Sequence, residues 1–112
     1  MVSSEIEKAK PYVLVEIVEY IANSVVTKTI LKKMTGTICL MSVDMGEGIS
    51  EKTTPFDTFV QIIEGEAEIL ISDNVTHLHN GESIIIPAHA KNSIKPNGRF
   101  KMIQTVIKSG YE

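Results

Sequence analysis

Few side chains in this 112-residue chain could do chemistry, and most of them lie in two short stretches. Lys52, Thr54 and Thr58 follow a glycine-rich loop, while His89 and Asn92 follow a proline that ends an apolar run. A lysine can bind a carboxylate or phosphate or, where it is desolvated, act as a base or form a Schiff base. Hydroxyl, amide and imidazole groups can orient a small polar molecule. The simpler interpretations are a loop lysine that reaches into solvent and a solvated loop histidine.

Nucleophilic catalysis has little support in the sequence. Cys39 is the only cysteine, and it lies within the apolar run 38–41, where a buried thiol is expected. No Gly-x-Ser-x-Gly motif is present, and the Gly-Glu-Gly sequence at 46–48 does not resemble a phosphate loop because no helix is predicted after it. A lone cysteine also indicates a reducing, cytoplasmic location.

Two histidines form a separate candidate site. His77 and His79 alternate along a predicted strand, so their imidazoles are expected on the same face. This spacing can bind a metal ion, and Asp57 or Glu51 could add a carboxylate. The simpler interpretation is a pair of exposed histidines beside the turn at residues 80–81.

Composition and charge restrict the classes of partner. The net charge is −3 and the basic residues are scattered, which argues against nucleic acid as a partner. The first twenty residues do not form a signal peptide, and no apolar segment is long enough to span a bilayer. We therefore expect neither nucleic acid nor a membrane as partner. The length suits a single domain over residues 1–112 with one hydrophobic core.

The elements that must position these side chains are mainly short strands. Residues 1–10 predict a flexible arm, and apolar residues at helical spacing predict a short helix over 11–22. A period of two predicts a β-barrel over residues 24–108, with a loop over 45–54. The predicted strands cover residues 24–33, 36–45, 56–63, 66–72, 75–79, 82–86, 92–95 and 100–107. The expected fold class is therefore all-β, a barrel or sandwich with one short N-terminal helix.

The turn residues resemble the two motifs of the cupin family. The first motif reads Gly, five residues, His-x-His, three or four residues, Glu, six residues, Gly, and its frame runs here from Gly46 to Gly65. The second reads Gly, five residues, Pro-x-Gly, two residues, His, three residues, Asn, and Gly81 and Pro87 match it. The resemblance covers residues 36–107 and implies a double-stranded β-helix, a small jelly-roll barrel with the site in its open mouth.

The chain departs from this family at the metal ligands. Lys52 and Thr54 stand where the first motif has its two histidines, Thr58 replaces the glutamate, and Asn92 replaces the histidine of the second motif. None of the four is a good ligand for Fe, Mn, Ni or Zn, and a protonated lysine repels a cation. We therefore expect no metal in the barrel and no other cofactor.

The expected pocket combines an apolar floor with a few polar groups. If Thr58 faces inward as the family's glutamate would, the period of two turns Val60 inward as well. In the last strand Met102 and Gln104 share a face with other apolar residues, so Gln104 is the single amide on that surface. The predicted ligand-binding residues are Lys52, Thr54, Thr58, His89, Asn92, Met102 and Gln104.

Three functions are compatible with this pocket. The first is metal-independent binding of a small organic molecule, with Lys52 selecting an anionic group. The second is a small cupin enzyme of the isomerase, lyase or oxygenase type, with rebuilt metal ligation or with Lys52 and His89 as a metal-free acid/base pair. The third is an assembly or regulatory domain whose interior is filled by side chains. Apolar positions at Ile103, Ile107 and 25–31 also predict a homodimer.

Overall fold

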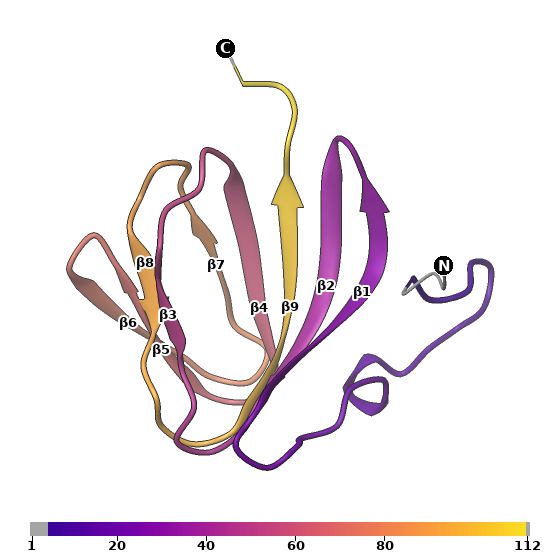
Figure 1. Ribbon diagram of the computed structural model, residues 1–112, viewed down its shortest axis with the longest axis horizontal. Helices are drawn as coiled ribbons and strands as arrows, with labels where there is room; N and C mark the ends of the chain where they lie inside the picture. Colours follow the sequence, from indigo (N-terminus) through magenta and orange to yellow (C-terminus); the bar gives the residue numbers. More distant parts are fainter. Residues whose placement is uncertain (1–4, 112) are drawn as a thin grey trace.

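The computed structural model describes residues 5–111 as two antiparallel β-sheets that face each other (Figure 1). Sheet A has the strand order β1-β2-β9-β4-β7, and sheet B has the order β3-β8-β5-β6. The strands are β1 (Val25–Lys33), β2 (Gly36–Val43), β3 (Ile49–Lys52), β4 (Asp57–Gly65), β5 (Ala67–Ile71), β6 (Asn74–Leu78), β7 (Ser83–Ile86), β8 (Asn92–Ile94) and β9 (Phe100–Ile107). The all-β prediction is confirmed.

The space between the sheets is filled by alternate residues of the strands, as the period of two predicts. The buried cluster comprises Val43, Val60, Ile62, Ala67, Ile69, Leu78, Ile86, Ile94, Phe100 and Met102. Val60 and Met102 therefore face inward, as the sequence predicted. In Figure 1 the two sheets lie close together at the bottom and diverge toward the top.

The hairpin between β5 and β6 turns one residue earlier than the sequence predicted. Ser72 and Asp73 form the turn with φ angles of 47° and 73°, and Asn74 already pairs with Ile71. Positive φ at both central positions belongs to a type I′ turn, whose twist matches that of the flanking strands. Asp and Asn both tolerate this conformation, so residue type alone could not locate the turn exactly.

The loop predicted over residues 45–54 contains a strand. Ile49–Lys52 forms β3 and pairs with β8. Three of its four residues are exposed, so the hydrophobic alternation that identifies a half-buried strand is missing. Gly48 allows the chain to enter this pairing, since a Cβ there would lie 2.6 Å from the backbone oxygen of Ile94.

The helix predicted over residues 11–22 is wrong. Only the 3-10 turn η1 (Leu14–Glu16) forms, and the rest of the segment runs irregularly along the outer face of sheet A. Val18 is buried there, whereas Val13 and Ile21 are 57% and 55% exposed, so burial accounts for only part of the apolar pattern. The Ser42 hydroxyl donates a 2.7 Å hydrogen bond to the backbone oxygen of Glu19. A side chain of the sheet thus satisfies a backbone carbonyl of this irregular segment.

A buried lysine holds the same segment on the sheet. Lys101 Nζ donates to the backbone oxygen of Val15 at 2.5 Å and lies 3.8 Å from Glu64 Oε2. The Tyr20 hydroxyl donates to the same carboxylate oxygen at 2.6 Å, and its ring centroid lies 5.1 Å from Lys101 Nζ. Burial and the hydrogen bond to Glu64 raise the pKa of Tyr20. Contacts between residues distant in sequence therefore decide the conformation of this segment.

The described part of the predicted arm is attached to β1. The carboxylate of Glu5 accepts a 2.6 Å hydrogen bond from the backbone of Lys32, and Ile6 donates to the backbone oxygen of Ile30 at 3.3 Å. Residues 5 and 6 therefore do not form a free arm, while residues 1–4 lie outside the described residues. Across residues 5–111, no helix has the length and apolar character to cross a membrane.

Candidate functional site

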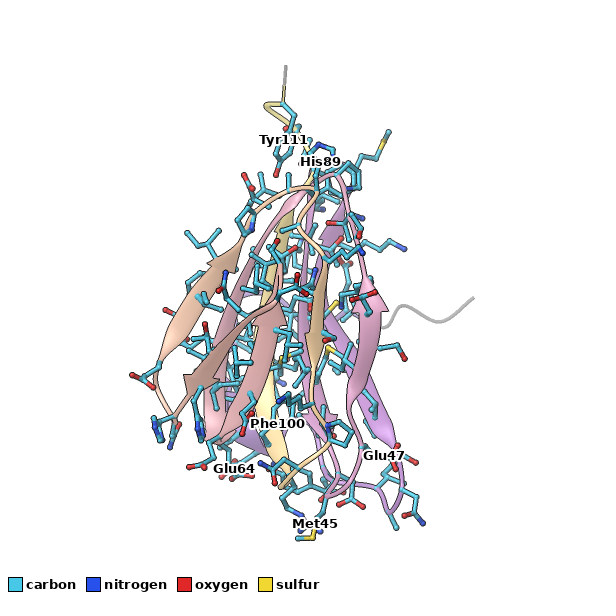
Figure 2. All side chains as sticks on the ribbon, turned by 90° about the vertical axis from the view of Figure 1, so that its left-hand side faces the viewer. Met45, Glu47, Glu64, His89, Phe100 and Tyr111 are labelled. Atoms are coloured by element: carbon cyan, nitrogen blue, oxygen red, sulfur yellow. The ribbon has the colours of Figure 1, made fainter. Side chains whose placement is uncertain are left out.

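The lower interior of the barrel is closed by apolar rows of side chains. Figure 2 places Phe100 toward the bottom of the molecule and His89 at the top. Phe100 pairs with Val43 across β9 and β2, and one step higher Met102 pairs with Met41 and Ile62. Met102 is only 1% exposed. It therefore belongs to this closed core, and the prediction that it lines a ligand pocket is not supported by its position.

Polar groups enter the interior in the next two rows. Gln104 lies opposite Cys39 on β2 and Val60 on β4. One step higher, Val106 lies between Thr37 on β2 and Thr58 on β4. Val60 and Thr58 are buried. The other four residues of these rows are partly exposed, in contrast to the core below them: Thr37, Cys39, Gln104 and Val106. We call these two rows the mouth, defined by Thr37, Cys39, Thr58, Gln104 and Val106.

Sheet B contributes a buried amide near the same end of the barrel. Asn92 on β8 pairs with Lys52 on β3 and with Ile71 on β5. Its Nδ2 donates to the backbone oxygens of Lys52 at 3.3 Å and Ala90 at 3.2 Å. The two carbonyl acceptors determine which way the amide points. Within residues 5–111, Asn92 Oδ1 accepts no hydrogen bond and is available to a ligand.

Lys52 supplies a positive charge next to this amide. The residue is exposed as a whole, but burial of its amine lowers the pKa of Lys52 below the ordinary value for lysine. No carboxylate of the described chain lies within ion-pair distance of the amine. A partly desolvated ammonium group without a protein counter-ion is suited to bind a carboxylate or phosphate.

Thr54 and His89 build the rim above the mouth. The Thr54 hydroxyl donates to the backbone oxygen of Phe56 at 3.0 Å and accepts from its N–H at 3.3 Å, so it stabilises its own loop. His89 donates its backbone N–H to the Thr54 oxygen at 2.7 Å and has a φ of 70°. The His89 side chain is exposed. The structure therefore brings both residues to one end of the barrel but engages the Thr54 hydroxyl within its loop.

Thr37 and Cys39 are mouth residues that the sequence analysis missed. Both alternate with the outward-facing Leu40 and Ser42, and they face inward because β2 pairs with β9 in this register. Thr37 Oγ1 is buried without a hydrogen-bond partner among the described residues. The period of two was visible in the sequence, but a one-residue change of register would have reversed the two faces.

The polar groups of the mouth do not fit a transition metal. Such ions select imidazole, thiolate and carboxylate groups that converge on one point. The mouth offers two threonine hydroxyls, the amide of Gln104 and the thiol of Cys39, and sheet B adds the amide of Asn92 and the ammonium group of Lys52. This donor set is suited to hydrogen bonding and to an anion rather than to a cation.

The predicted carboxylate partners of the histidine pair are wrong. Among the described residues, one group of three side chains could share a metal ion, and it consists of Glu66, His77 and His79. Neither Asp57 nor Glu51 belongs to it. Asp57 instead accepts a 2.8 Å hydrogen bond from the backbone of Ala88 at the rim.

The chain resembles known proteins in its structure. No family profile matches the sequence, and no curated protein matches it. A conserved protein of unknown function from Streptococcus pyogenes is similar in structure, with 27% identity, a TM-score of 0.89, and 96% of this chain and 94% of that chain covered. A cupin superfamily protein from Desulfitobacterium hafniense shows 28% identity and a TM-score of 0.86, with 97% of this chain and 99% of that chain covered.

A third relative extends the same result. A cupin 2 conserved barrel domain protein from Leptotrichia buccalis shows 26% identity and a TM-score of 0.81 over 84% of this chain, and the match covers 46% of that longer chain. Two facing sheets, the Gly46 and Gly81 motif turns and these structural neighbours agree with one another. The chain has the double-stranded β-helix fold, and its structural neighbours support its assignment to the cupin superfamily.

Proposed function

We propose that the mouth binds a small organic molecule with an anionic group and needs no metal ion to do so. The observation that carries this proposal is a buried polar group without a partner among the described residues, Thr37 Oγ1, in the row above Cys39 and Gln104. Buried hydroxyls and amides are rarely left unpaired in folded proteins, so a bound molecule is a natural partner. Asn92 Oδ1 offers a second acceptor, and Lys52 supplies the charge that selects an anion.

The side chains at and below the mouth favour a ligand with one polar and one apolar end. Val60 in the lower mouth row and Met41 in the row below it would contact an apolar group. The rows at the mouth present hydroxyl and amide groups, which would contact a polar group. Small-molecule sites commonly combine an apolar wall with a few polar groups that fix orientation.

An enzymatic function has one observation in its favour. The lowered pKa of Lys52 increases the fraction of neutral amine near neutral pH, and the neutral amine is the form that attacks a carbonyl. If the protein is an enzyme of this kind, borohydride added with a carbonyl-containing ligand should leave a covalent adduct on Lys52. If a carbonyl-containing ligand binds but forms no adduct, this enzymatic function is excluded and only the binding function remains.

Lys52→Ala should weaken the binding of an anionic ligand by about 10- to 100-fold, since a hydrogen bond to a charged group contributes roughly 1.5–3 kcal/mol. Asn92→Ala should weaken it by about fivefold through the loss of a neutral hydrogen bond. The measurement is a thermal-shift screen of carboxylates and phosphates with a chelator present, followed by calorimetry on the hits. Binding should also weaken as pH rises through the lowered pKa of Lys52, because the bound form carries the charge.

Lys91→Ala is the matched control for this prediction. Lys91 is an exposed lysine next to Asn92 in the sequence, and its removal should leave affinity unchanged. Equal effects of Lys52→Ala and Lys91→Ala would contradict a specific role for Lys52. Hits that appear only after addition of Fe, Mn, Ni or Zn would contradict the metal-independent function.

We also expect the chain to form a homodimer through the outer face of sheet A. Leu31, Ile38, Thr105, Phe59 and Ile85 form one outward row across its strands. Ile85 is 63% exposed, and a hollow of ≈ 240 Å³ lies at the other end of this row, beside Leu31 and Ile38. A twofold axis would place the protruding residue of each copy at the hollow of the other.

Light scattering of the purified chain tests this homodimer. We expect a dimer that Ile85→Lys converts to a monomer, because a charge would be buried without a partner. A monomer at all concentrations would exclude the dimer. The cytoplasmic location inferred from the lone cysteine stays a prediction.

A further inference from the structure

A second cluster of potential ligands lies outside the barrel, on sheet B. His77 belongs to the edge strand β6, at the left of Figure 1, and His79 follows the end of that strand. Glu66 immediately precedes β5, and the pairing of Ala67 with Leu78 continues to bring Glu66 opposite His79. The three side chains thus lie on the hydrogen-bonded strands β5 and β6 or immediately next to them, and they share the outward face.

Two distances within this cluster, one to each carboxylate oxygen of Glu66, are close to those between two ligand atoms of a zinc ion. His77 Nε2 lies 3.1 Å from Glu66 Oε1, and His79 Nδ1 lies 3.4 Å from Glu66 Oε2. Two ligand atoms on one tetrahedral zinc ion lie about 3.3 Å apart, as bond lengths of about 2.0–2.1 Å require. One ligand atom from each residue can be chosen so that all three lie within 4.8 Å of one another.

The two imidazole rings are already arranged side by side. Their centroids are 4.6 Å apart and their planes differ by 10°. All three side chains are exposed, so a rotation about their side-chain bonds can complete the approach without disturbing the core. The cost of organising the site is therefore mainly the loss of rotamer freedom of three surface side chains.

The backbone that carries these ligands is held by its own hydrogen bonds. The backbone N–H of His79 donates a 2.7 Å hydrogen bond to Glu82 Oε1, which fixes the chain just beyond β6. Glu68, opposite His77 on the same face, lies 3.6 Å from Lys95 Nζ and is engaged in that ion pair. The carboxylates of Glu66 and Glu82 add negative charge near the histidines, which favours a cation.

We propose that Glu66, His77 and His79 bind one Zn²⁺ ion on the outer face of sheet B, with the fourth coordination position open to solvent. Zinc is the expected ion because two imidazoles and one carboxylate suit it, while Mg²⁺ prefers oxygen ligands alone. The open position makes the site able to hold water or a group from another molecule. This site is separate from the mouth, so its test does not depend on whether the mouth binds a ligand.

Calorimetry with ZnCl₂ on the untagged, chelator-treated full chain tests the proposal. We expect one Zn²⁺ per chain with a dissociation constant in the micromolar range. Because even residues that only orient a ligand contribute about 10- to 100-fold to metal affinity, each of His77→Gln, His79→Gln and Glu66→Gln should weaken binding by at least tenfold. Mg²⁺ should neither bind at the site nor compete with Zn²⁺.

His89→Gln is the matched control, since His89 is the third of the chain's three histidines and lies at the rim of the barrel. It should leave zinc affinity unchanged. In NMR spectra the ring protons of His77 and His79 should shift on zinc addition, while those of His89 should not. Circular dichroism of the His77→Gln/His79→Gln double variant should show an intact fold, because both side chains are exposed.

Two outcomes would overturn the proposal. One is the absence of stoichiometric zinc binding by a folded wild-type chain, which would leave the cluster as a hydrogen-bonded and stacked surface group. The other is a loss of affinity in His89→Gln as large as that in His77→Gln, which would place the ion at the barrel mouth.

Discussion

Gly65→Ala should destabilise the protein much more than Gly46→Ala, although both glycines belong to the same sequence motif, Gly46 at its start and Gly65 at its end, and both have positive φ. Their φ angles are 79° and 81°. A Cβ on Gly65 would lie 2.5 Å from the backbone oxygen of Arg99, whereas a Cβ on Gly46 would meet nothing within 4 Å. The left-handed conformation alone costs roughly 1–2 kcal/mol for a non-glycine residue. With the added overlap, we expect a loss of roughly 2–5 kcal/mol for Gly65→Ala.

Gly48→Ala separates the cost of steric overlap from the cost of the left-handed backbone conformation. Gly48 does not have positive φ, but its Cβ would lie 2.6 Å from the Ile94 oxygen and 2.8 Å from the Pro96 nitrogen. This variant should therefore show the cost of steric overlap alone, about 1–3 kcal/mol. Gly81, with φ of 90° and no atom within 4 Å of its Cβ, should behave like Gly46.

Urea unfolding followed by circular dichroism measures all four variants. The expected order of lost stability places Gly65→Ala first, with Gly46→Ala and Gly81→Ala close to each other. Equal losses for Gly65→Ala and Gly46→Ala would show that the close approach of β4 to the residues preceding β9 does not restrict position 65. The two motif glycines would then serve only their turns.

Phe100→Ala should lower the free energy of unfolding by about 3–5 kcal/mol, the usual cost of removing a fully buried aromatic side chain. Phe100 is 1% exposed and pairs with Val43 and Gly65 in the lowest interior row. It closes the end of the barrel opposite the mouth, and no neighbouring side chain is large enough to replace the lost volume without rearrangement. Thermal or urea unfolding gives the measurement.

Phe59→Ala is the control for this second prediction. Phe59 is an aromatic residue of the same sheet, but it faces outward and is 37% exposed. Its removal should cost far less in a monomer, because most of the loss for Phe100 arises from the cavity left in a close-packed interior. A similar cost for both variants would contradict the closed lower end. Ligands found for the mouth should still bind Phe100→Ala, because the Met102 row separates the two regions.

Much of the fold could be predicted from local signals in the sequence. Alternation of apolar residues located the strands of both sheets except β3, and Gly65 and Gly81 identified turns that require positive φ. These signals are local because the period of side chains along a strand and the φ preference of glycine depend on only a few neighbouring residues. The prediction of a helix over residues 11–22 failed because the apolar spacing there reflects packing on sheet A in part, and not a helix.

The candidate site was predictable only in part. Motif spacing predicted Lys52 and Asn92 at one site, and the two residues do pair across β3 and β8. Thr37 and Cys39 could not be assigned to the mouth, since their inward direction depends on the pairing of β2 with β9, far apart in the sequence. Met102 was assigned to the pocket because residue type and period do not show how deep a row lies.

The sequence by itself determined the cupin fold and the replacement of all four metal ligands in its usual site, because both depend on which residue types occupy fixed spacings. Only the tertiary structure decided which polar groups share a space. It placed the Thr37 hydroxyl without a partner in the mouth, and it brought Glu66 to His77 and His79 in place of the expected Asp57 or Glu51. The physical reason is that a site forms where strands distant in the chain are paired, and register, not composition, sets which side chains meet.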